Sequence, residues 1–102
     1  MAMDMNKMMK QARKMQADIA KAQEEALLLT AEGTSGGGVV KAVAGGDQTI
    51  HSLTIDPSAV DPEDVEMLQD LVITAINDAL CQVTDLVNTR MSAATGGMNL
   101  PF

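Results

Sequence analysis

Residues 4–30, DMNKMMKQARKMQADIAKAQEEALLLT, contain no Gly or Pro and consist mainly of Ala, Met, Lys, Gln and Glu. These residue types are strong helix formers, so the stretch predicts one continuous helix. Asp4 is a suitable N-cap, because a short acidic side chain can accept a hydrogen bond from the first turn. At 1.5 Å per residue the predicted helix is about 40 Å long, which allows it to project beyond a small body.

This predicted helix has two different faces. Apolar residues recur at alternating spacings of three and four, which is a heptad seam suited to packing. The seam consists of Met5, Met8, Ala12, Met15, Ile19, Ala22, Ala26 and Leu29. The roughly opposite side carries the basic face, which we define as Lys7, Lys10, Lys14 and Lys21, with Arg13 at its margin. One side is therefore available for packing and the other for an anionic partner.

The charge of the chain is divided unevenly. The net charge is -7, but residues 1–21 hold five of the seven basic residues and only two acids, which makes this segment +3. The remaining residues hold 2 basic and 12 acidic side chains, or -10. An anionic polymer would respond to the local positive field, while the acidic body limits indiscriminate binding.

The middle of the chain predicts a three-stranded antiparallel meander over residues 28–55. A glycine-rich turn at 31–38 precedes a β-branched run from Val39 to Ala44. Gly45-Gly46-Asp47 is a hairpin signal, and residues 49–55 alternate between apolar and polar side chains. The first strand is expected at about 28–34, where helix and strand signals overlap.

A second long helix is predicted over residues 62–93. Asp61 is the expected N-cap, Pro62 the first helical residue, and acids fill the first turn. Gly96-Gly97 ends this helix, and residues 96–102 form a tail. Its core seam is Val65, Leu68, Val72, Ala75, Ala79, Val83 and Leu86, widened by Leu71, Ile76, Leu80 and Val87. Together these segments predict a single α/β domain of the α+β type over residues 1–102.

The core must be aliphatic and small. The chain has no Trp or Tyr, nine Met, and one Phe, which is the last residue, Phe102. Such a core, with apolar surface broader than one small sheet needs, predicts that a second copy covers part of it. The residues expected to pack in the core or the dimer are Met8, Met15, Ile19, Leu68, Val72 and Ile76.

No catalytic site is expected. A nucleophile needs a nearby base, and the single His51 is far in sequence from the single cysteine, Cys81. We interpret His51 as an exposed strand residue and Cys81 as a small buried hydrophobe. Capping explains Asp61, Glu63 and Asp64, and the cluster that they form with Glu66 lacks calcium-loop spacing. Gly36–Gly38 match no phosphate-binding motif, so we expect no metal, cofactor or small-molecule substrate.

Location and membrane contact follow from the same observations. A lone cysteine, together with the lack of an apolar signal segment, predicts a reducing cytoplasm, and no apolar run is long enough to span a membrane. The basic face itself has three interpretations: a solvated lysine surface, an anionic-polymer site, or a membrane surface. The membrane interpretation is weaker, because insertion requires the Met seam to be free of packing partners.

Several strings, in one order along the chain, resemble the YbaB/EbfC family of bacterial nucleoid-associated proteins. In the first helix these are Met8–Ala12 (MMKQA) and Met15-Gln16, followed by residues 33–41 (GTSGGGVVK) and 55–58 (IDPS). Residues 66–72 (EMLQDLV), 75–79 (AINDA) and 97–102 (GMNLPF) complete the set, so the resemblance spans essentially the whole chain.

The resemblance implies an intertwined homodimer whose helices project like the arms of a tweezer. It further implies binding of double-stranded DNA with little sequence preference, and a role in nucleoid organisation or gene regulation. The DNA-binding residues carried over are Lys7, Lys10, Arg13, Lys14, Lys21 and, more weakly, Arg90. The second helix departs from the family pattern, because Arg90 is its one basic residue. The alternative is a protein–protein adaptor that docks a partner helix on the heptad seam.

Overall fold

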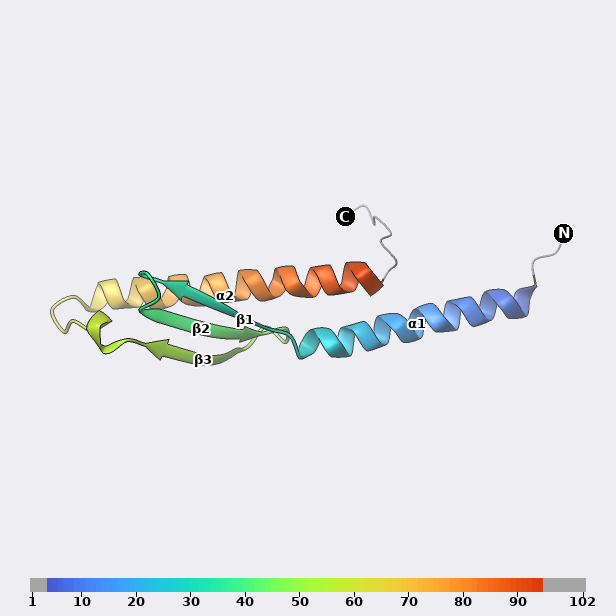
Figure 1. Ribbon diagram of the computed structural model, residues 1–102, viewed down its shortest axis with the longest axis horizontal. Helices are drawn as coiled ribbons and strands as arrows, with labels where there is room; N and C mark the ends of the chain where they lie inside the picture. Colours follow the sequence, from blue (N-terminus) through green and yellow to red (C-terminus); the bar gives the residue numbers. More distant parts are fainter. Residues whose placement is uncertain (1–3, 95–102) are drawn as a thin grey trace.

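The computed structural model describes residues 4–94 and consists of two long helices joined by a three-stranded sheet (Figure 1). The order of elements is α1 (Met5–Leu27), β1 (Thr30–Ser35), β2 (Val40–Gly45), β3 (Ile50–Ile55), the short 3-10 helix η1 (Pro57–Ala59) and α2 (Val65–Ala94). The predicted fold class, a long N-terminal helix, an antiparallel sheet and a long C-terminal helix, is confirmed. The predicted tail at 96–102 lies outside the described residues.

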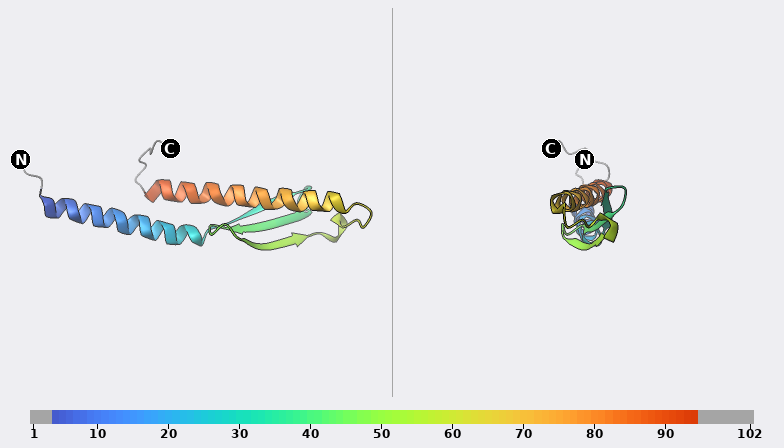
Figure 2. Two further views of the ribbon diagram at one scale, coloured as in Figure 1. Left: turned by 180° about the vertical axis from the view of Figure 1, so that it is seen from behind. Right: turned by 90° about the vertical axis from the view of Figure 1, so that its left-hand side faces the viewer.

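The molecule is elongated. Its principal extents are 77 × 23 × 16 Å and its radius of gyration is 20.3 Å, whereas a compact chain of this length has a radius of about 13 Å. Helix α2 lies along the sheet and continues past its end, and α1 leads away from the sheet at that same end, as Figures 1 and 2 both show. Much of α1 is therefore remote from the body.

Helix α1 begins as the sequence predicts and ends earlier. The Asp4 carboxylate accepts a hydrogen bond from the backbone N–H of Asn6 at 3.0 Å, which confirms Asp4 as the N-cap. The helix ends at Leu27, and strand β1 begins at Thr30. The segment where helix and strand signals overlapped is thus the junction between α1 and the sheet.

The sheet has the order β1-β2-β3, with both pairs antiparallel. The tip between β1 and β2 contains Gly36, Gly37 and Gly38, all with positive φ, a conformation that favours glycine. The β2–β3 turn is the hairpin predicted at residues 45–47, closed by a hydrogen bond from the Gly45 N–H to the Thr49 carbonyl at 2.8 Å. A register irregularity interrupts the β2–β3 pairing between Val43 and Ala44.

The core lies between one face of the sheet and α2, and it is made of small side chains. The cluster consists of Val40, Ala42 and Ala44 from β2 with Ala75, Ala79 and Val83 from α2. Val72 and Ile76, two of the predicted packing residues, lie against this cluster and are partly buried. Small residues at these positions allow α2 and the sheet to approach closely.

Strand β1 makes the closest approach to α2. Gly33 lies inside β1, in agreement with the strand predicted at about 28–34, although the turn predicted at 31–38 also included it. A Cβ on Gly33 would lie 2.2 Å from the Ala79 nitrogen and 2.4 Å from the Ala75 oxygen. The Thr34 N–H donates to the Asp78 carboxylate at 3.0 Å, and the Ser35 hydroxyl donates to the Leu71 carbonyl at 2.6 Å. These two hydrogen bonds fasten the edge strand to the helix.

Helix α2 begins three residues later than predicted, at Val65. Asp61 is not its N-cap: the Asp61 carboxylate accepts from the Glu63 N–H in a preceding turn. Asp64 occupies the cap position, and its carboxylate accepts from the Met67 N–H at 3.2 Å. The sequence Asp-Pro suits a turn, with Asp at the first position and Pro at the second, which explains the misplaced start.

Parts of both predicted seams are not buried within the protomer. Of the α1 seam, Ala22 and Ala26 are buried, whereas Met8 and Met15 are 48% and 49% exposed. Leu86, predicted to lie in the α2 core seam, is 44% exposed. Val65, at the start of that seam, is exposed as well. Val65 and Leu86 lie before and after the stretch of α2 that packs on the sheet, Leu71 to Val83, so the prediction that they are core residues is wrong. Met8 and Met15 are expected to pack in the core or in a dimer, and their packing in a dimer stays a prediction.

Cys81 is also exposed, contrary to the expectation of a small buried hydrophobe. It follows Ala79 by two positions, which places it about 200° around the helix from the face that packs on the sheet. The apolar residues that neighbour Cys81 in sequence therefore lie on a different side of α2.

Candidate nucleic-acid interface

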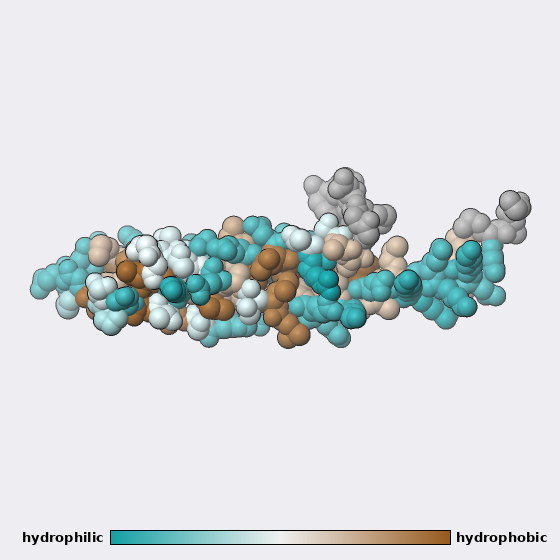
Figure 3. Space-filling view, in the orientation of Figure 1, coloured by the Kyte–Doolittle hydropathy of each residue, from teal (hydrophilic) through white to brown (hydrophobic). Residues whose placement is uncertain are grey.

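The basic face lies on α1, and most of it lies on the part that leaves the body. Residues 4–18 of the chain are all exposed, and partial burial begins at Ile19. We call residues 5–18 the α1 arm. The arm carries four basic residues with exposed side chains: Lys7, Lys10, Arg13 and Lys14. In the space-filling view its hydrophilic surface extends beyond the sheet on the N-terminal side (Figure 3).

The inner part of α1 packs through the side opposite the basic face. Ala22 and Ala26 are 3% and 5% exposed and continue the seam of Met8 and Met15. Gly46, in the β2–β3 turn, approaches this side so closely that a Cβ would lie 1.8 Å from the Ala26 carbonyl oxygen. The Gly46 N–H also donates to the Leu29 carbonyl at 2.8 Å. These contacts orient α1 so that its basic side faces away from the packed side.

The two remaining predicted DNA-binding residues, Lys21 and Arg90, meet at the joint between α1 and α2. Both line a shallow hollow together with Asp18, Ala22, Ala93 and Ala94. Arg90 also forms an ion pair with Glu25 of α1. The structure therefore divides the predicted site into four cations on the arm and two at the joint, where acids lie beside them.

Helix α2 carries the opposite charge. From Val65 to Ala94 it contains Glu66, Asp70, Asp78 and Asp85 against the single base Arg90, a net charge of -3. No ion pair among residues 4–94 engages the four cations of the arm. An anionic polymer is thus attracted to the arm and repelled from the outer surface of α2.

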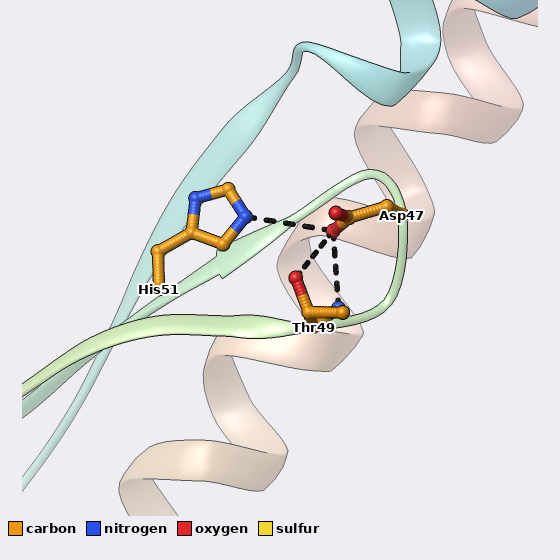
Figure 4. A network of polar contacts seen from close by, with 3 residues as sticks. All are labelled: Asp47, Thr49 and His51. Atoms are coloured by element: carbon orange, nitrogen blue, oxygen red, sulfur yellow. Dashed lines mark hydrogen bonds and ion pairs between the residues drawn. The ribbon is translucent and has the colours of Figure 1, made fainter.

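His51 is exposed on β3, as predicted, and its Nε2 lies 3.5 Å from an Asp47 carboxylate oxygen (Figure 4). The same oxygen accepts hydrogen bonds from the Thr49 hydroxyl at 2.7 Å and the Thr49 N–H at 3.1 Å. These hydrogen bonds, the hydroxyl first, hold the pKa of Asp47 below its ordinary value. Asp47, Thr49 and His51 lie together at the β2–β3 turn, and the contact with the Asp47 carboxylate explains where the His51 ring lies.

Two other kinds of site, a metal centre and a membrane-spanning helix, are absent among the described residues. Within residues 4–94, no three His, Cys, Asp or Glu side chains are grouped so as to hold a metal ion. Across the same residues, no helix combines the length and apolarity that crossing a bilayer requires. Sequence reasoning missed Glu25, whose contact with Arg90 depends on how α1 and α2 cross.

Comparison with known proteins adds to this geometry. A family model described as the YbaB/EbfC DNA-binding family matches residues 1–98. A nucleoid-associated protein of Desulforamulus reducens is 61% identical over 98 residues, which cover 96% of this chain and 93% of that protein. Nucleoid-associated proteins of Exiguobacterium and Moorella thermoacetica are 56% and 54% identical, covering 96% of this chain and 93% and 94% of theirs.

A solved structure shares the fold. The crystal structure of an uncharacterized protein from Helicobacter pylori matches with a TM-score of 0.65 and 25% sequence identity. The match covers 86% of this chain and 92% of that chain. The arrangement of two long helices around a small sheet therefore recurs at low sequence identity.

Proposed function

The chain belongs to the YbaB/EbfC DNA-binding family, which is not an enzyme family, and we propose that it binds double-stranded DNA largely through phosphate contacts. The observation that carries this proposal is the α1 arm, where four exposed cations lie on a helix that leaves an otherwise acidic body. Lysine and arginine on one helix side can follow a phosphate backbone without reading its sequence. We propose that this DNA binding serves nucleoid organisation and gene regulation.

Little sequence specificity is expected from the residues available. The chain has one aromatic residue, Phe102, so no aromatic side chain on the arm can stack on a base or wedge between base pairs. Asn6, Gln11 and Gln16 are exposed on the arm and can reach base edges. They are spaced five residues apart, about 140° around the helix from one to the next, so they do not form one reading surface for a defined site.

The first test is the salt dependence of DNA binding. If two protomers together neutralise about six phosphates, the affinity should fall roughly a thousandfold between 50 and 200 mM salt, because bound counterions are released. Gel-shift titrations at these two salt concentrations measure the fall. Binding that does not depend on salt, or no binding at 50 mM, would contradict the proposed phosphate contacts.

We propose that the working form is a homodimer in which the arms of two protomers act as a tweezer. Met8 and Met15 continue the seam that packs at Ala22 and Ala26, yet among residues 4–94 they stay about half exposed. Leu53 of β3 is 41% exposed, although its partner Ala42 in the β2 register is fully buried. Exposed apolar side chains in line with a packed seam suit a second copy of the chain.

The dimer predicts a mass of about 21 kDa, twice the 10.7 kDa of one chain, by light scattering at micromolar concentration. A monomer would contradict the dimer and leave the Met seam free for another protein. The exposed Met8 and Met15 are the observation that favours the second candidate function, a protein–protein adaptor. For the adaptor, Met8→Asp and Met15→Asp abolish partner binding, while alanines on the basic face do not.

Location follows from the proposed ligand. A protein that binds chromosomal DNA in a bacterium works in the cytoplasm, in association with the nucleoid. The relatives described above carry the name nucleoid-associated protein, which supports this location. Fluorescence microscopy of a tagged chain together with a DNA stain would test it, and a signal excluded from the nucleoid would contradict it.

A further inference from the structure

Three lysines of the basic face and one acid form a single line along α1. Lys7, Lys14 and Lys21 are spaced by seven residues, about 10 Å apart along the helix axis. Glu25 follows Lys21 by four residues and lies five helical turns from Lys7, on the same side. The line of positive charge is therefore interrupted by an acid where α1 meets α2.

Arg90 of α2 lies at this interruption. It forms an ion pair with Glu25, and it lines the same hollow as Lys21. Without Glu25, the line of lysines on α1 would continue directly onto α2 through Arg90. With Glu25 in place, the charge of Arg90 is compensated within the protein.

The ion pair is accessible to a competing anion. The side chains of Arg90 and Glu25 are 45% and 36% exposed. Exposed ion pairs are weak in water, whereas a guanidinium binds phosphate through two parallel hydrogen bonds. A DNA phosphate near the joint is therefore a chemically suitable replacement for the Glu25 carboxylate.

We infer that Glu25 limits DNA affinity by competing with the phosphate backbone for Arg90, and that the DNA track extends from α1 onto α2. This inference rests on the proposed DNA-binding function. Arg90, which the family resemblance implies as a DNA contact, would then contact DNA in competition with Glu25. Glu25 then holds the guanidinium in position and keeps binding weaker than the cations alone would allow.

The test is a gel-shift salt series on the full-length chain with Glu25→Gln, which keeps the size and removes the charge. A freed Arg90 should steepen the logarithmic salt dependence by about 0.9 for each protomer, or about 1.8 for a dimer. The variant should bind more tightly than wild type at 50 mM salt. Its advantage should shrink about twelvefold between 50 and 200 mM.

Glu24→Gln is the matched control, because it makes the same charge change one position away. Glu24 is exposed and takes part in none of the ion pairs of residues 4–94. We expect Glu24→Gln to keep the wild-type salt slope. Glu25→Gln combined with Arg90→Gln should also return to the wild-type slope, because the competing pair is then removed as a unit.

Two results would overturn the inference while leaving the proposed function intact. One is an equal salt slope for Glu25→Gln and Glu24→Gln. The other is a steeper slope for Glu25→Gln that persists when Arg90 is also Gln. Failure of the wild-type chain to bind DNA at 50 mM salt is a different result, and it would contradict the proposed function itself.

Discussion

A chain carrying Lys10→Glu and Lys14→Glu should bind DNA at least about a hundredfold more weakly than wild type at 50 mM salt. Both positions lie on the exposed part of the α1 arm, so each protomer exchanges two attractions to phosphate for two repulsions. Each phosphate contact that is lost also removes about 0.9 from the logarithmic salt dependence. A gel-shift titration with random-sequence duplex DNA measures both quantities.

The fold should tolerate this double change. Lys10 and Lys14 are exposed, and neither side chain forms an ion pair or a hydrogen bond within residues 4–94. Glu has nearly the same helix propensity as Lys, so α1 should form as before. Circular dichroism and light scattering on the variant check the helix content and the mass. A folded variant with wild-type affinity would contradict DNA binding by the arm.

Lys41→Glu provides the matched control for a single reversal at Lys10. Lys41 is exposed on β2, outside α1, and the charge change is identical. We expect Lys10→Glu to weaken binding and reduce the salt slope, and Lys41→Glu to leave the slope unchanged. Equal losses in the two variants would indicate a response to net charge and no defined binding surface.

The elements of the fold could be predicted because their signals are local. The 4–30 stretch lacks helix breakers, and the Gly45-Gly46-Asp47 turn lies between two β-branched runs, so each element is specified by its own residues. The Asp61-Pro62 sequence misplaced the start of α2, since a β-turn and a helix cap favour the same residue types. The predicted boundaries of helices and strands are wrong where two local signals compete.

The site could be predicted only in part, because its electrostatics depend on tertiary contacts. The exposed cations of the arm follow from the helical period alone. The compensation of Arg90 by Glu25 depends on the crossing of two helices that are far apart in sequence, which no local pattern encodes. The exposure of Leu86 also depends on tertiary structure, because it reflects how far the sheet extends along α2. Cys81 is exposed because it lies on the side of α2 that faces away from the sheet.

Gly33→Ala should destabilise the protein by about 3 kcal/mol, near the upper end of the usual cost of overpacking a core. The added methyl group would lie 2.2 Å from the Ala79 nitrogen, 2.4 Å from the Ala75 oxygen and 2.7 Å from the Ala79 Cα. All three atoms belong to helix backbone, which cannot rotate away as a flexible side chain does. Strand β1 and α2 would have to separate, weakening the core that positions α1.

Gly37→Ala is the control for this last prediction, because a Cβ on Gly37 meets no atom within 4 Å. Its φ of 75° disfavours alanine, so a smaller loss of about 1 kcal/mol is expected there from backbone strain alone. Urea unfolding followed by circular dichroism compares the two variants at one protein concentration. A Gly33→Ala chain as stable as Gly37→Ala would mean that β1 and α2 can separate at little cost. The close approach at Gly33 would then not be what holds the sheet on α2, and the orientation of the α1 arm would depend on the contacts of Gly46 and Glu25 instead.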